Sequence, residues 1–206
     1  MSFGEWAFAH VYDALMSGSE KKGLADMRRD LLGGAKGEVL EIGAGTGLNL
    51  PFYGDEISGL TLAEPSKSMI GQLNRKVEQD RPGTMVLRAP AEDLPFEDNS
   101  FDTVVSTLVL CSVDDQPRAL RELRRVLRPG GELLLLEHVR SSKPNIVTWQ
   151  NRLNGVNQFV LQGCNLNRPT LDQALQAGFR RGAMTSGEFP ESPPFIRELI
   201  IGTLVA

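Results

Sequence analysis

The chain has 206 residues, of which 41% are hydrophobic, so it can bury the core of one soluble domain without disulfides or metal ions. Its net charge of −4 excludes a nucleic-acid-binding surface built on bulk positive charge. The two cysteines, Cys111 and Cys164, lie far apart in the sequence and offer neither a disulfide framework nor a metal cluster. The N-terminus lacks the pattern of a signal peptide, and no apolar run approaches the ~18 residues of a membrane span, so we expect a cytoplasmic protein.

Helix-like and strand-like patterns alternate along the chain, which predicts a parallel sheet with helices on both faces. Residues 8–32 have a helical pattern with a break at Gly18 or Gly23. The elements expected after it are strand 37–43, helix 46–53, strand 58–64, helix 66–79, strand 84–88, strand 101–107, helix 115–127, strand 131–138, a helix containing residues 149–160, a short helix at 170–177, and strands near 179–187 and 195–204. No linker is long enough to separate domains, so residues 1–206 are expected to form a single domain.

The most informative stretch is 39–47, an apolar run that stops at Gly43, Gly45 and Gly47. Glycines permit a positive φ and remove the Cβ atoms that would stand between the main chain and a ligand. The pattern predicts a strand that delivers the backbone to a nucleotide-like cofactor, followed by a helix whose N–H groups face the same crevice. Leu48 occupies the position where the dinucleotide-binding pattern has its third small residue.

A second acidic landmark is Glu64, at the end of strand 58–64 and seventeen residues beyond Gly47 (64 − 47 = 17). A ribose-binding carboxylate is expected about 20 residues beyond such a glycine turn. A carboxylate suits this place because it can accept hydrogen bonds from both ribose hydroxyls at once. The alternative is an ordinary tight turn, with Glu64 as a solvated strand end.

The glycine stretch and four later motifs together resemble the methyltransferase type 11 branch of the class I S-adenosylmethionine-dependent methyltransferases. The later motifs are Ala63-Glu64-Pro65-Ser66, Ala91-Glu92-Asp93-Leu94-Pro95-Phe96, Ser100-Phe101-Asp102 and Val126-Leu127-Arg128-Pro129-Gly130-Gly131. The resemblance implies an α/β fold with a Rossmann-like, doubly wound, mostly parallel seven-stranded sheet and an antiparallel last strand. It also implies S-adenosylmethionine as the cofactor, methyl transfer to a small-molecule acceptor, and no metal.

A narrower set of motifs resembles the methyltransferase-like 7 group of animal thiol S-methyltransferases. These motifs are Asn49-Leu50-Pro51-Phe52-Tyr53, Thr107-Leu108-Val109-Leu110-Cys111-Ser112-Val113, Glu137-His138-Val139 and Gly163-Cys164-Asn165-Leu166-Asn167-Arg168. This resemblance suggests a thiol acceptor. That group carries an N-terminal membrane anchor, for which this sequence has no counterpart, so we expect no membrane span and a monomer or homodimer.

The resemblance to the methyltransferases assigns the cofactor-binding residues. The methionine and ribose portions would be lined by Glu41, Gly43, Ala44, Gly45 and Gly47, with Thr46 and Asn49 available for hydrogen bonds, and the ribose would be held by Glu64. Thr107 and Leu108, after the fourth strand, would reach the methionine end.

On the adenine side, Met69 or Pro65 would pack on the base, although Met69 could equally belong to the core. The wider family meets the adenine amino group with an aspartate, and this chain has Pro90 at the corresponding place. Ala91 and Glu92 would therefore supply the adenine contacts, through backbone groups or the Glu92 side chain.

The resemblance also makes residues 1–34 N-terminal lid helices, with Tyr12 closing over the cofactor carboxylate. An amphipathic helix that buries Trp6, Phe8 and Tyr12 as packing is the compatible alternative. His10 could face the substrate or be exposed on this helix.

The acceptor is expected to be recognised by an insertion at residues 141–169. There, Asn151 and two further asparagines form a polar stripe that could orient the acceptor or simply be solvated. Cys111 and Cys164 could line the acceptor pocket, or each could be a small buried hydrophobe. His138, at the end of the fifth strand, is the candidate general base, with a hydrogen-bonded structural histidine as the alternative. A thiol acceptor, with a pKa near 8.5, has less need of a base than an oxygen or carbon acceptor.

Two other functions stay open at this point. A nicotinamide-dependent oxidoreductase would use the same kind of glycine turn, but Leu48 departs from its pattern. A non-catalytic cofactor-binding module that acts as a regulator would have the same cofactor residues with a blocked acceptor cleft.

Overall fold

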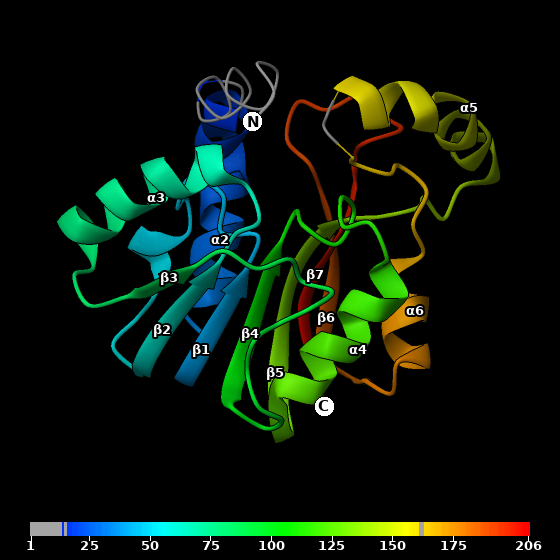
Figure 1. Cartoon of the computed structure of the whole chain (residues 1–206). Coiled ribbons are helices and arrows are strands. Elements are labelled where there is room, and N and C mark those ends of the chain that lie inside the picture. Colours follow the sequence, from blue (N-terminus) through cyan, green and yellow to red (C-terminus); the bar gives the residue numbers. More distant parts are fainter. Residues whose placement is uncertain (1–13, 15, 161–162) are drawn as a thin grey trace.

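The computed structural model describes residues 14, 16–160 and 163–206 and contains one seven-stranded sheet in the order β3-β2-β1-β4-β5-β7-β6 (Figure 1). The strands are β1 (Gly37–Ile42), β2 (Ile57–Ala63), β3 (Met85–Leu87), β4 (Phe101–Thr107), β5 (Leu127–His138), β6 (Arg180–Glu188) and β7 (Glu198–Val205). Strands β1 to β5 pair in parallel, and β7 is antiparallel to both of its neighbours. This topology confirms the predicted fold. The strand order reverses between β1 and β4, where open α/β sheets bind their ligands.

Helices cover both faces of this sheet, as predicted. They are η1 (Glu20–Leu24), α2 (Ala25–Leu32), η2 (Leu50–Phe52), α3 (Lys67–Asp80), α4 (Gln116–Val126), α5 (Pro144–Val160) and α6 (Thr170–Gln176). One apolar core lies on the side of α2 and α3, where Leu32 and Leu73 are buried. The other lies on the side of α4 and α6, around Leu120 and Ala174. Among the described residues, no helix is both long and apolar enough to cross a membrane.

The break in the first helical region lies at Gly23, one of the two predicted positions. Lys22 and Gly23 both have non-helical backbone angles, and Gly23 has a φ of 125° that suits glycine. The kink separates α2 from the residues before it.

The predicted helix at 46–53 is wrong. The chain forms only the single 3-10 turn η2 there, because Gly47 is left-handed with a φ of 85° and Tyr53 is already extended. Pro51 also lacks the N–H that a longer helix would use. The loop after β1 therefore does not present a full helix N-terminus to the crevice.

Strand β5 is longer than the predicted 131–138. It begins at Leu127, which pairs with Phe101, and the ladder is irregular between Phe101 and Thr103. The glycine-containing turn that ends α4 is thus absorbed into the edge of the β4–β5 ladder rather than lying outside it.

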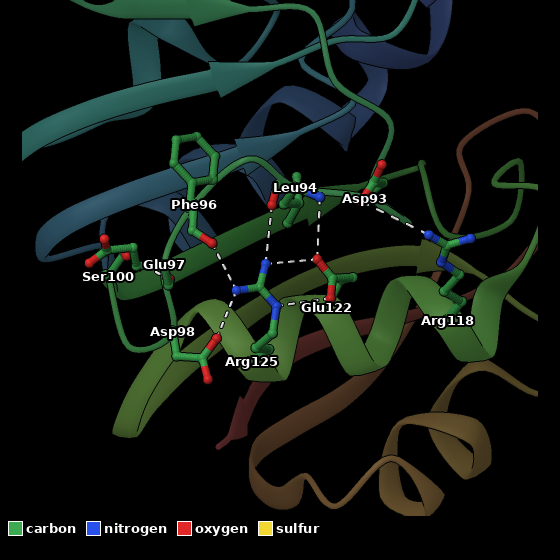
Figure 2. Close-up of polar contacts among 9 residues, drawn as sticks. All are labelled: Asp93, Leu94, Phe96, Glu97, Asp98, Ser100, Arg118, Glu122 and Arg125. Atoms are coloured by element: carbon green, nitrogen blue, oxygen red, sulfur yellow. Dashed lines mark hydrogen bonds and ion pairs between the residues drawn. The ribbon is translucent and has the colours of Figure 1, made fainter.

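A network around Arg125 on α4 holds the loop that leads from β3 to β4 (Figure 2). The guanidinium donates to the carbonyl oxygens of Leu94 (3.1 Å) and Phe96 (2.8 Å) and to the carboxylates of Asp98 (2.9 Å) and Glu122 (2.8 and 2.9 Å). The hydrogen bonds from Arg125 lower the pKa of Glu122 below its ordinary value. The planar guanidinium of Arg125 therefore joins the loop to the helix through several hydrogen bonds at once, whereas the ammonium group of a lysine could not reach all of these acceptors.

We predict that Arg125→Lys lowers the free energy of unfolding by roughly 1–3 kcal/mol, because several charge-assisted hydrogen bonds are lost and two backbone carbonyls lose their donor. The matched control is Arg121→Lys on the exposed face of the same helix, which should change stability by less than about 0.5 kcal/mol. Denaturant unfolding of both variants measures the difference. Equal stabilities would show that the network does not hold the loop.

Candidate cofactor and acceptor site

A small cavity of about 20 Å³ lies at the carboxyl ends of β1 and β4, where the strand order reverses. Its lining is Arg28, Glu41, Gly43, Ala44, Gly45, Thr46, Leu48, Asn49 and Thr107. Seven of these nine were predicted as cofactor-binding residues. Arg28 and Leu48 were not. The structure thus brings the predicted methionine-end residues together around one point.

The three glycines of the turn have different roles. A Cβ at Gly43 would lie 2.5 Å from the side chain of Val109, and a Cβ at Gly47 would lie 2.8 Å from Leu50. Gly45 has a left-handed φ of 58°, yet a Cβ there would meet nothing closer than 3.8 Å, where one of its two neighbours is the sulfur of Met69. Gly43 and Gly47 are therefore required by packing within the protein. Gly45 would tolerate a Cβ at ordinary van der Waals distances and is the glycine that a ligand could approach.

Glu64 fastens the glycine turn to the strand beside it. Its carboxylate accepts hydrogen bonds from the backbone N–H of Gly45 (2.9 Å) and of Ser66 (2.7 Å). Burial raises the pKa of Glu64 above its ordinary value, and the two backbone hydrogen bonds oppose that rise. The predicted ribose-binding carboxylate is thus at the turn, with each oxygen already oriented by the main chain.

Glu41 lies beneath the turn in a buried hydrogen-bond network. It accepts from the Tyr53 hydroxyl (2.6 Å) and from the Asn49 amide (2.9 Å), and the same amide donates to Thr107 (2.9 Å). Burial raises the pKa of Glu41 to about 7, although these hydrogen bonds lower it. Three predicted residues from β1, the turn and β4 are therefore linked directly to one another.

Arg28 on α2 completes this network, and sequence reasoning missed it. Its guanidinium is 3% exposed and donates to Asn49 (2.8 Å), Thr107 (2.9 Å) and Glu20 (3.0 Å). One sequence signal could have found it: Arg28 is a charged residue at a helical spacing otherwise occupied by buried apolar residues, such as Leu24 and Leu31. A charged residue within such an apolar stripe is buried only when it is paired.

The predicted adenine-side residues differ from one another in exposure and in contacts. Met69 is half-buried at the start of α3, next to Gly45, which favours a place at the site over one in the core. Pro65 is exposed and Ala91 is buried. The Glu92 carboxylate accepts from the backbone N–H of Asp115 (3.1 Å), so this side chain is engaged at the start of α4.

The loop after β4 is held by Glu137. One carboxylate oxygen of this buried residue accepts from the Ser106 hydroxyl (2.7 Å) and from the backbone N–H groups of Val109 (2.9 Å) and Leu110 (3.1 Å). Within this loop, Leu108 has a left-handed φ of 60°, which is a strained conformation for a residue with a side chain. Glu137, which sequence reasoning did not place in the site, thus stabilises the backbone turn that carries the predicted residue Leu108.

Cys111 belongs to this loop and lies close to His138 and Cys164. His138 is 2% exposed, and within the described part of the chain neither of its ring nitrogens has a hydrogen bond of normal geometry. A hydrogen bond to Cys164 and burial raise the pKa of Cys111 well above its ordinary range, and the neighbouring His138 opposes this rise. Three predicted acceptor-site residues from β5, the loop after β4 and the segment after α5 therefore share one location.

The polar stripe of α5 makes hydrogen bonds to the segment that follows the helix, and of its three asparagines only Asn151 is exposed. Asn154 accepts from the backbone N–H of Leu166 (2.7 Å), Asn157 donates to the carbonyl of Cys164 (2.8 Å), and Asn151 accepts from Asn167 (2.8 Å). The asparagines hold the segment 163–167, while Trp149 and Val156 on the same helix are 53% and 64% exposed. Asn151 consequently contacts the protein itself. The two remaining predicted residues, His10 and Tyr12, lie outside the described residues.

Arg168 also fastens this segment to the loop after β4. Its guanidinium donates to the carbonyl oxygens of Leu110 (2.7 Å) and Val113 (2.6 Å). Asn165 adds hydrogen bonds to the Cys111 carbonyl from its backbone N–H (2.8 Å) and from its side chain (3.0 Å). The segment after α5 is thus a fixed wall beside the end of β4.

Comparison with known proteins agrees with this geometry. Residues 40–135 match the family Methyltransf_11, described as a methyltransferase domain. The chain is 32% identical to the human thiol S-methyltransferase TMT1A over 203 residues, which cover 96% of this chain and 82% of that protein. It is 36% identical to the phosphatidylethanolamine N-methyltransferase of Cereibacter sphaeroides over 149 residues, which cover 68% and 70% of the two chains.

A solved structure shares the fold. A SAM-dependent methyltransferase from Thermotoga maritima superimposes with a TM-score of 0.69 at 23% identity, covering 97% of this chain and 95% of that one. None of these comparisons supports a nicotinamide-dependent oxidoreductase. The chain belongs to the class I S-adenosylmethionine-dependent methyltransferases, in the methyltransferase type 11 branch.

Proposed function

We propose that this methyltransferase transfers the methyl group of S-adenosylmethionine to the thiol of a small molecule in the cytoplasm, as a monomer or homodimer. The observation that carries the thiol assignment is the similarity to TMT1A, which is named as a thiol S-methyltransferase. His138, a buried imidazole without a hydrogen bond of normal geometry in the described structure, lies beside the loop after β4 and would serve such an acceptor as a base.

The residues around the glycine turn fit the cofactor. Gly45 leaves room for a ligand against the main chain, and the ionised Glu64 can accept from ribose hydroxyls while it holds the turn. Arg28 offers a positive charge inside the cavity, which suits the cofactor carboxylate. Met69 would pack on the adenine, and the backbone of Ala91 and Glu92 would meet its edge, since the Glu92 side chain is engaged with Asp115.

The remaining predicted cofactor residues would shape the site around the methionine end of the cofactor. Glu41, Asn49 and Thr107 would shape the methionine end through their shared hydrogen bonds, together with Gly43, Ala44, Thr46 and Gly47 of the turn and Leu108 after β4. We assign residues 1–34 as the lid, because Arg28 of this segment lines the cavity and bonds to Glu20 of the same segment. Tyr12 would close over the cofactor, and His10 would face the acceptor.

Methyl transfer requires little of the protein beyond alignment of the nucleophile with the methyl group and its sulfur. When bound, S-adenosylmethionine supplies a methyl group on a sulfonium, which a nucleophile accepts by in-line displacement; alignment alone accounts for ~7–11 kcal/mol of such a barrier. The buried residues after β4 exclude water from the place where the acceptor thiol would lie. An unprotonated nitrogen of His138 would take the thiol proton, because the thiolate is the reactive form.

Residues 141–169 are assigned as the acceptor-recognition insertion. Its segment 163–167 brings Cys164 to Cys111 and His138, so the acceptor would be bounded by β5, the loop after β4 and this segment. Asn151 would act by supporting the segment, through its hydrogen bond with Asn167. An assay with radiolabelled cofactor against a panel of thiols, phenols, amines and phosphatidylethanolamine tests the assignment. Transfer to the amines alone would overturn the thiol acceptor.

Gly45→Val should abolish measurable cofactor binding while the protein stays folded, because the new side chain fills the space beside the turn. The matched control is Gly83→Val, which also forces a side chain onto a left-handed backbone but in open space after α3. Both should lose roughly 1–2 kcal/mol of stability from backbone strain. Isothermal titration with S-adenosylmethionine separates them, and undiminished affinity in Gly45→Val would refute the placement of the cofactor at this turn.

His138→Asn should lower kcat for a thiol acceptor roughly 100-fold at neutral pH, with the cofactor Kd unchanged. The loss should shrink as the pH is raised toward about 9, because the acceptor thiol then ionises without a base. Asn151→Ala is the control, since its amide supports the segment after α5 and takes no proton. A loss in kcat that is the same at every pH would contradict the role of His138 as a base.

Cofactor affinity should fall as the pH is lowered, because ribose hydroxyls donate to the ionised Glu64 carboxylate. Burial raises the pKa of Glu64 above 4.5, so protonation, and with it the loss of affinity, sets in at a higher pH than for an exposed glutamate. Kd should be constant at pH values above this raised pKa and rise steadily as the pH falls through it. Glu64→Gln should bind weakly with a flat profile. The same slope in both proteins would assign the effect to another group.

A further inference from the structure

The fold brings together two cysteines that are fifty-three residues apart in the sequence (164 − 111 = 53). Their backbones are fixed relative to each other, because Asn165 donates to the Cys111 carbonyl from its main chain (2.8 Å) and from its side chain (3.0 Å). Both cysteines are free, and each thiol influences the pKa of the other. Neither methyl transfer nor cofactor binding requires such a pair.

The two thiols have different surroundings. Cys111 is 3% exposed and is held against the Leu108 carbonyl (3.7 Å) and the Ser112 hydroxyl (3.4 Å). Cys164 is half-buried. The hydrogen bond from Cys111 lowers the pKa of Cys164, and Asn157 and the charge of Arg168 act in the same direction against burial. Cys164 is therefore the more accessible and the more readily ionised thiol of the pair.

His138 provides a second, independent feature of this cluster. Its imidazole is buried beside Cys111, and both ring nitrogens lack a hydrogen bond of normal geometry within the described structure. Buried polar groups in native proteins almost always have partners, so an imidazole in this state is available for proton transfer. It can accept the proton of Cys111 when that thiol reacts.

We propose that Cys164 and Cys111 form a thiol–disulfide exchange site for small-molecule disulfides, with Cys164 as the attacking thiol and Cys111 as the resolving thiol. The Cys164 thiolate attacks one sulfur of the disulfide, forms a mixed disulfide and releases one small thiolate. Cys111 passes its proton to His138 and attacks the Cys164 sulfur, which forms the Cys111–Cys164 disulfide and releases the second thiolate. The two protein thiols are oxidised, and one small disulfide is reduced to two small thiols.

The exchange reaction does not depend on methyl transfer, because it involves neither cofactor nor methyl group. The two reactions would nonetheless share residues, because Cys111, Cys164 and His138 also lie at the proposed acceptor position. A bond between these cysteines would join the segment 163–167 covalently to the loop after β4, whose conformation Glu137 maintains. Oxidation would therefore act on the wall that bounds the acceptor position.

The test exposes the full-length protein to bis(2-hydroxyethyl) disulfide and follows its intact mass without cofactor. The wild type should become lighter by two hydrogen atoms, with the bond mapped to Cys111 and Cys164 after digestion without reduction. Cys111→Ser should instead keep a stable mercaptoethanol adduct on Cys164. Cys164→Ser should react far more slowly than Cys111→Ser, because its remaining thiol is buried.

Three outcomes would overturn the proposal. The wild type could retain the adduct without forming the internal disulfide, react first at Cys111, or stay unmodified while its thiols react readily after denaturation. The wild-type result alone decides between these outcomes and the proposal, so a serine variant that fails to fold does not weaken the test. Because no outcome depends on methyl transfer, failure here is distinguishable from failure of the proposed thiol acceptor.

Discussion

Three buried carboxylates at the carboxyl ends of parallel strands hold the whole ligand-facing edge of this protein. Glu41 near the end of β1 binds the hydroxyl of Tyr53 and the amide of Asn49, Glu64 after β2 binds the N–H of Gly45, and Glu137 near the end of β5 binds N–H groups of the loop after β4. Loops at this edge leave the sheet ladders and expose backbone donors that must find acceptors when buried. A carboxylate offers several acceptor positions in one residue, so three side chains suffice for three loops.

This arrangement has an electrostatic cost that explains the position of Arg28. Burial raises the pKa of all three carboxyl groups, which means that their ionised forms are disfavoured in the folded protein. Arg28 lies inside the same region and bonds to Asn49 and Thr107, so its charge lowers the pKa of Glu41 without a direct ion pair. Its third partner, Glu20, lies beyond the kink at Gly23, and through it η1 and α2 are tied to the end of the sheet.

The sheet and the cofactor turn could be predicted from the sequence because their signals are local. Strand runs and glycine spacing leave marks within a few residues, whereas the doubly wound, seven-stranded arrangement was implied by the resemblance to the methyltransferases. The predicted helix at 46–53 does not form, for an equally local reason: Pro51 and the left-handed Gly47 allow only one helical turn. Arg28 and Glu137 were missed because burial of a charge depends on partners that are distant in the sequence, such as Thr107 at 79 residues from Arg28.

The acceptor side is less predictable than the donor side for a structural reason. The donor turn is built largely from main-chain groups at strand ends, so its shape follows from the sheet itself. The acceptor wall is built from side chains of one inserted segment, and helix α5 directs Asn154 and Asn157 toward that segment. Hydrogen bonds of Asn165 and Arg168 to carbonyl oxygens then fix the wall against the loop after β4. Substitutions in this segment can reshape the acceptor position while the three carboxylates continue to hold the sheet edge, which separates acceptor choice from cofactor binding in this fold.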